Sequence, residues 1–119
     1  MSCLKFQGNY EGPGKITTII NGVILNINSF DKLILTKLEN GAFSAVVTYI
    51  NYPSGNTGTV NLIFTRNGDQ LISGNNGVDV LTFRDDGRLV HTFTPPTTAG
   101  GRNISGIIVY KKIRNKCHY

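Results

Sequence analysis

Residues 3–16, CLKFQGNYEGPGKI, contain the pattern that decides the fold. Tyr10 follows Gly8 two positions later, and Gly12-Pro13-Gly14 comes almost directly after it. Short apolar runs bounded by Gly and Pro are typical of β-strands that end in tight turns. The stretch therefore predicts a strand at 4–10, a turn, and a second strand at 15–20.

The same alternation of short apolar runs and turn residues continues along the whole chain. Asn-Gly and Asp-Gly pairs recur, and these residues tolerate the positive φ that hairpin turns require. No window shows a helical period over about ten residues. The runs between turns predict strands at 4–10, 15–20, 23–28, 32–38, 42–51, 58–66, 70–73, 78–84, 88–93 and 104–113.

These runs predict one all-β domain over residues 1–119, an up-and-down antiparallel β-barrel of eight to ten strands. The length suits one domain, and 39% hydrophobic against 16% charged residues suits a folded core. Closure into a barrel hides the edges of such a meander. The two longer connections, at 51–58 and 94–103, are expected to surround one mouth of the barrel, where ligands or partners bind.

One hairpin can be predicted in detail. Residues 84–88, RDDGR, suit a type I turn followed by a glycine in the left-handed region. That turn pairs Phe83 with Leu89 and Leu81 with His91. A two-residue turn would shift this register and exchange the neighbours.

This register brings Asp79 and His91 together, the one His–carboxylate pair that it places close. Such a pair inside a barrel would anchor the polar group of a ligand or act as acid and base. The alternative is an ordinary cross-strand polar pair. Phe83, Phe93 and Tyr10 are expected to provide the apolar walls of the same ligand site.

The end of the chain concentrates positive charge, and the whole chain has a net charge of +5. One interpretation is contact with an anion or an acidic protein partner, and the other is a solvated strand end whose charges discourage edge pairing. No nucleic-acid recognition signature accompanies the charge, so nucleic acid is not an expected partner. The basic residues are Lys111, Lys112, Arg114 and Lys116.

Cys3 and Cys117 lie at opposite ends of the sequence. In a barrel with an even number of strands these ends come together, and a disulfide there would contribute about 4–5 kcal/mol in the loop-entropy view. The alternative is two free thiols in a reducing compartment. Cys117 and His118 are adjacent and lack the spacing of zinc ligands. We expect neither a metal nor a cofactor.

The segment Phe6-Gln7-Gly8-Asn9-Tyr10 resembles the first strand of avidin-type barrels, and residues 106–112, GIIVYKK, are similar to their last strand. Lipocalins open with a similar motif. The resemblance implies an eight-stranded, ligand-holding barrel. Avidins surround biotin with Trp and carry Asn at the position of Gly12, whereas this sequence contains no Trp. The resemblance therefore does not imply a biotin site.

The expected function is a non-catalytic binding module that holds a small apolar ligand or presents its loops to a protein partner. One alternative is a structural subunit of an assembly, such as a virion component, which would form homo-oligomers. Another is a barrel cyclase or isomerase that uses Asp79 and His91. A filled interior favours the structural role, an open cavity favours ligand binding, and a cavity with a hydrogen-bonded His–carboxylate pair also suits an enzyme.

Two targeting features bear on location. No apolar run approaches the roughly 20 residues of a membrane-spanning helix, so no membrane span is expected. The N-terminus lacks a charged head followed by an apolar run, which predicts an intracellular location.

Overall fold

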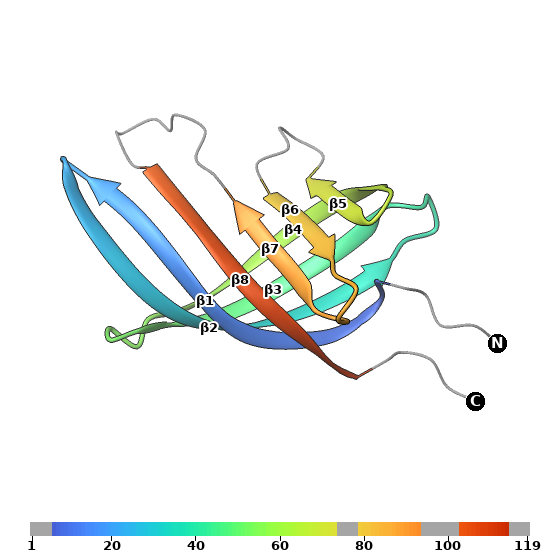
Figure 1. The fold of residues 1–119 in the computed structure, drawn as a ribbon, viewed down its shortest axis with the longest axis horizontal. Coiled ribbons are helices and arrows are strands. Elements are labelled where there is room, and N and C mark those ends of the chain that lie inside the picture. The colour runs from blue at the N-terminus through green and yellow to red at the C-terminus, as the bar shows by residue number, and fades with distance from the viewer. Residues whose placement is uncertain (1–5, 74–78, 94–102, 115–119) are drawn as a thin grey trace.

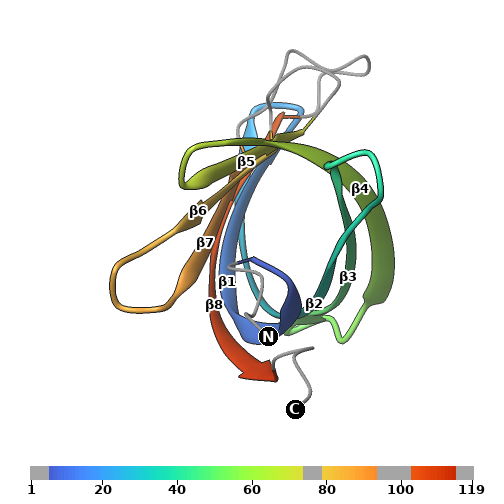
Figure 2. The same cartoon turned by 90° about the vertical axis from the view of Figure 1, so that its right-hand side faces the viewer.

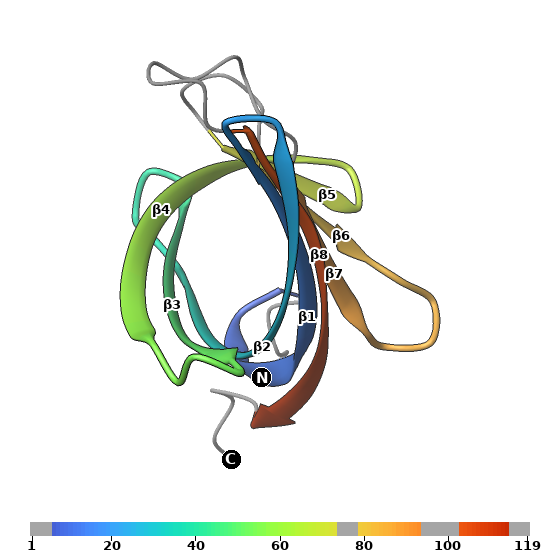
Figure 3. The ribbon, with the colours of Figure 1, turned by 90° about the vertical axis from the view of Figure 1, so that its left-hand side faces the viewer.

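The computed structural model describes residues 6–73, 79–93 and 103–114. Neighbouring strands join in chain order and close into one antiparallel barrel, which confirms the predicted fold (Figure 1). Figures 2 and 3 show the strands as a ring, with the β6–β7 hairpin standing away from it. The strands are β1 (Gly8–Ile20), β2 (Val23–Lys37), β3 (Phe43–Tyr52), β4 (Thr57–Asn67), β5 (Gln70–Ser73), β6 (Asp79–Phe83), β7 (Leu89–Phe93) and β8 (Asn103–Arg114).

Pairing of the first and last strands closes the barrel. In this antiparallel pair, Gly14 lies opposite Ile108 and Thr18 opposite Ile104, with a register shift between Asn9 and Tyr10. The predicted pairing of the chain ends is confirmed for this part of the molecule. Cys3 and Cys117, and the predicted disulfide between them, lie outside the described residues. The described part contains no helix long and apolar enough to cross a membrane.

Two predicted interruptions are wrong, because the chain continues through both as a strand. The predicted turn at Gly12–Gly14 lies inside β1, and residues 29–31, the gap between the predicted strands at 23–28 and 32–38, lie inside β2. The two segments pair with each other, Gly12 opposite Asp31 and Gly14 opposite Ser29. The ten predicted runs therefore become eight strands, two of which are long.

Close approach of two backbones explains the glycine in the first of these segments. A Cβ added to Gly12 would overlap the main-chain carbonyl oxygen of Val109 in β8. Glycine inside a strand often marks such an approach. The Gly-Pro-Gly sequence therefore brings β1 against β8, and does not reverse the chain.

The predicted hairpin chemistry is confirmed at two turns. Asn21 and Gly22, which connect β1 to β2, both have positive φ, at 51° and 79°. Gly87 has φ of 86°, in the left-handed region that the RDDGR turn requires. The β6–β7 register follows the prediction, with Phe83 opposite Leu89 and Leu81 opposite His91.

Apolar side chains fill the half of the barrel in which β1 begins and β8 ends. Phe6 packs edge-on against Phe43 and Phe83, with ring centroids 5.8 and 5.7 Å apart. Arg66 and Lys112 lie over the rings of Phe6 and Tyr10. The core therefore fills this half of the barrel and leaves no ligand cavity there among the described residues. The buried set is Phe6, Tyr10, Leu33, Leu35, Phe43, Ala45, Val47, Phe64, Leu71, Leu81, Leu89, Ile108 and Tyr110.

Candidate functional site

A cavity of about 500 Å³ occupies the other half of the barrel. Leu25 and Val60 face it but are 44% and 40% exposed, so the cavity opens to solvent at this end. Most of the lining is apolar. The lining residues are Ile16, Thr18, Leu25, Ile27, Asp31, Val47, Tyr49, Asn51, Val60, Leu62, Asp79, His91, Phe93, Ile104 and Ile108.

Glycines on the inner face shape two of the walls. Phe93 in β7 lies opposite Gly106 in β8, and a Cβ on that glycine would meet the Phe93 ring at 2.6 Å. Tyr49 in β3 is placed over Gly58 in β4 in the same way. A glycine opposite an aromatic residue lets the ring lie across the neighbouring strand. Both rings therefore occupy space beside the neighbouring strand that a side chain at Gly58 or Gly106 would take.

His91 and Asp79 form a hydrogen-bonded pair on one wall of this cavity. The His91 Nε2 atom lies 2.9 Å from Asp79 Oδ1, and His91 is only 5% exposed. When Asp79 is ionised and His91 is neutral, the Nε2–H group donates to Asp79, and Nδ1 is an acceptor. This Nδ1 atom is buried and has no partner among the described residues. The pair therefore presents an unused acceptor inside the barrel.

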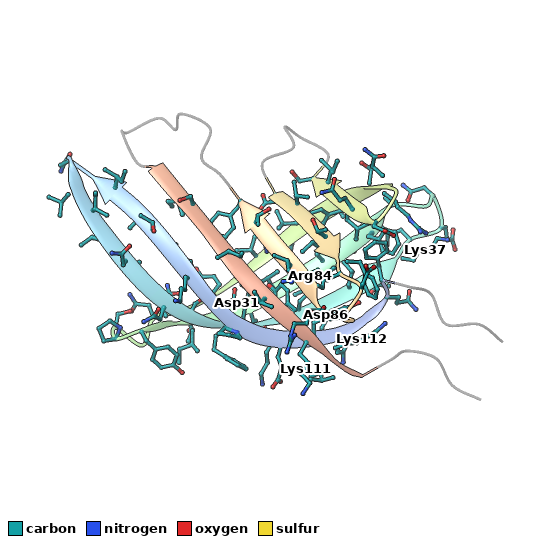
Figure 4. All side chains as sticks on the ribbon, in the orientation of Figure 1. Asp31, Lys37, Arg84, Asp86, Lys111 and Lys112 are labelled. Carbon is teal, nitrogen blue, oxygen red and sulfur yellow. The ribbon has the colours of Figure 1, made fainter. Side chains whose placement is uncertain are left out.

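Asp31 contributes a second carboxylate, from β2. It is 3% exposed and accepts a hydrogen bond of 2.6 Å from the Ser29 hydroxyl. Burial raises the pKa of the Asp31 carboxyl, and the Ser29 hydroxyl and the charge of His91 oppose that rise without cancelling it. Figure 4 marks Asp31 near the middle of the barrel, between the core and the open half.

Further polar atoms of the lining lack partners. Thr18 Oγ1 and Asn51 Oδ1 are buried and unpaired among the described residues. Buried polar groups are normally hydrogen-bonded, and leaving one unpaired costs roughly 1–3 kcal/mol. A bound molecule with hydrogen-bond donors would satisfy them.

The structure places the predicted ligand-site residues in two groups. Asp79, His91 and Phe93 line the cavity, and their contact with a ligand stays a prediction. Tyr10 is fully buried in the core, where its hydroxyl donates to the Phe6 carbonyl, and Phe83 packs against the same core. Tyr10 and Phe83 are therefore not cavity walls, because their strand positions lie at the filled end of the barrel.

The basic residues of β8 do not share one surface. Lys111 is exposed on the outer face, whereas Lys112 is partly buried, with its Nζ atom 5.6 Å from the centre of the Tyr10 ring. Burial lowers the pKa of Lys112. Successive strand residues point to opposite faces, so these two lysines (Figure 4) cannot contact one anion together. The Arg114 side chain, Lys116 and the loop at 94–102 lie outside the described residues.

Sequence reasoning missed Asp31 as a site residue and gave Tyr49 and Asn51 no role in the interior. The signal for all three is alternation within unbroken strands. The inner face of β2 carries every second residue of the strand. Two of these residues, Ser29 and Asp31, are polar, and the others are apolar: Ile27, Leu33 and Leu35. The prediction of two separate strands, at 23–28 and 32–38, concealed that pattern.

Replacing Asp31 with Asn is expected to stabilise the unliganded protein at neutral pH by about 1 kcal/mol, because it removes a buried charge. The native pKa of Asp31 is raised above 3.8, so the protonated form is favoured by folding. Its contribution to stability is present below that pH and is lost as the pH rises through the native pKa. The advantage of Asp31→Asn should therefore shrink on acidification. Urea unfolding of both proteins across pH 3–8 measures this, and a constant difference would contradict it.

Comparison of the chain with protein-family models found no match, and comparison with curated proteins found no significant similarity. The barrel agrees with the fold that the avidin and lipocalin resemblance implies, and membership of either family stays a prediction.

Proposed function

We propose that this chain is a binding module that holds a small, largely apolar molecule inside its barrel. The observation that carries the proposal is the open cavity of about 500 Å³ with mostly apolar walls. Ligand pockets typically have volumes of this order, and a few polar groups in them orient the ligand. The volume equals that of about 17 water molecules at their share of liquid volume, which suits a ligand with up to about that number of non-hydrogen atoms.

Filling the cavity with a large side chain should abolish binding. Leu62 lines the cavity, whereas the next residue, Ile63, is 52% exposed on the outer face of β4. We expect Leu62→Trp to weaken binding of the neutral dye N-phenyl-1-naphthylamine at least about tenfold, as lost apolar burial of a few CH₂ groups implies. Ile63→Trp, a matched control, should bind like the wild type.

Dye fluorescence titration measures this, after thermal unfolding has confirmed that both variants fold. The natural chain contains no Trp, so the new indole also reports its own surroundings in each variant. Equal dye affinity in the two variants would contradict the proposal. The proposal is supported if the wild type and Ile63→Trp bind the dye saturably and Leu62→Trp binds it at least about tenfold more weakly.

A second candidate function is a barrel cyclase or isomerase, supported by the 2.9 Å contact between His91 and Asp79 in the cavity wall. A histidine oriented by a carboxylate can transfer protons to and from a bound molecule. The two functions differ in the fate of the ligand. A compound recovered unchanged after long incubation favours a binding module, and conversion that His91→Phe abolishes favours an isomerase.

A further inference from the structure

The ionisable groups that line the cavity are mostly acidic. Among the described residues of the lining these groups are Asp31, Asp79, His91 and Tyr49, and none is Lys or Arg. Two carboxylates against one imidazole leave a negative formal charge even when the imidazole is protonated. The lysines nearest along β1 and β2, Lys15 and Lys32, are exposed. An anionic ligand would therefore be repelled inside the barrel although the chain as a whole is basic.

Asp31 is a buried carboxylate with no cation in direct contact among the described residues. Its one described hydrogen-bond donor is the neutral Ser29 hydroxyl. A protonated His91 acts on the Asp31 carboxyl from beyond ion-pair distance, because its ion pair is with Asp79. Buried charges in proteins are normally paired. Asp31 lines the cavity, so a ligand can bring the missing positive charge to it.

The unpaired atoms around the cavity are acceptors as well. When His91 is neutral and donates its Nε2–H to Asp79, its Nδ1 atom offers a lone pair. Asn51, which lies opposite Ser29 in β3, has a buried Oδ1 atom with no partner among the described residues. An ammonium group carries three N–H donors and no acceptor. It therefore complements a carboxylate with neighbouring acceptors better than a hydroxyl or a carboxylate does.

Resting on the proposed binding function, we infer that the cavity selects an organic cation, an apolar amine whose ammonium group pairs with Asp31. The apolar remainder of the molecule lies along Ile16, Leu62 and Ile108. An amine of about ten carbons has fewer non-hydrogen atoms than the roughly 17 that the water-volume comparison allows, so it fits within the cavity.

Competition among three compounds with one chain length tests this inference. Decylamine, 1-decanol and decanoic acid displace the neutral dye from the full chain at about pH 7.5, where an alkylamine is cationic. We expect decylamine to displace the dye at a concentration at least about tenfold below that of 1-decanol, the scale of one charged hydrogen bond. Decanoate should require a higher concentration than either.

Asp31→Asn keeps the shape of the side chain and removes its charge. With the dye concentration set to the variant's own dye affinity, decylamine and 1-decanol should displace the dye from Asp31→Asn at similar concentrations. Asp86→Asn makes the same change on the exposed β6–β7 hairpin, where the Asp86 side chain is 41% exposed, and should keep the preference for the amine.

The outcomes separate the two proposals. Failure of the dye to bind the wild type overturns the binding function and the inference together. Dye binding with equal competition by all three compounds, or with decanoate strongest, overturns the inference alone. A preference for decylamine that survives in Asp31→Asn overturns the assignment to Asp31.

Discussion

Replacing Gly12 with Ala is expected to destabilise the barrel by about 3 kcal/mol or more, enough to unfold a marginally stable domain. The added Cβ would overlap the carbonyl oxygen of Val109, which is main chain and cannot rotate away. Relief requires β1 and β8 to separate at the seam that closes the barrel. The lost pairing on both sides of Gly12 adds to the steric cost.

Gly68→Ala provides the matched control. Gly68 lies in the β4–β5 turn with φ of 64°, and an added Cβ there would meet nothing within 4 Å. Its substitution costs only the left-handed conformation, about 1 kcal/mol. Urea unfolding measures the loss of stability in each variant, from the shift of the unfolding midpoint at an unchanged m-value. Equal losses would mean that β1 and β8 do not approach closely at Gly12.

The parts of the fold that sequence reasoning predicted depend on local chemistry. Asn21-Gly22 and the RDDGR turn each reverse the chain within a few residues, so turn type and register follow from the residues themselves. The Asp79–His91 contact was accessible for the same reason, because both residues lie on one short hairpin.

The parts that sequence reasoning missed depend on contacts between distant segments. Gly12 resembles a turn glycine until Val109, almost a hundred positions away in the chain, is placed against it. Asp31 has no charged neighbour in sequence other than Lys32, and its surroundings in the cavity come from β3, β7 and β8. Only closure of the barrel brings β2 together with β7 and β8. Sequence reasoning could therefore predict the Asp79–His91 contact on the β6–β7 hairpin, but not the position of Asp31 in the same cavity.

Replacing Phe64 with Ala is expected to destabilise the protein by about 3–5 kcal/mol, the range for deleting a buried aromatic side chain. Phe64 has no exposed surface, and its ring lies edge-on to His91 with centroids 6.5 Å apart. It therefore connects the core to His91 in the cavity wall. Its removal leaves a hole that the surrounding strands cannot close, because barrel pairing fixes their positions.

Ile63→Ala and Phe64→Leu show whether this loss comes from burial. Ile63 is adjacent on the exposed face of β4, and its truncation should change stability by about 0.5 kcal/mol or less. Phe64→Leu keeps most of the volume and should cost about 1.5 kcal/mol or less. The midpoints of urea unfolding rank the three variants. Equal losses for the Ala variants at positions 63 and 64 would contradict the inward orientation of Phe64, and with it the packing of Phe64 against His91.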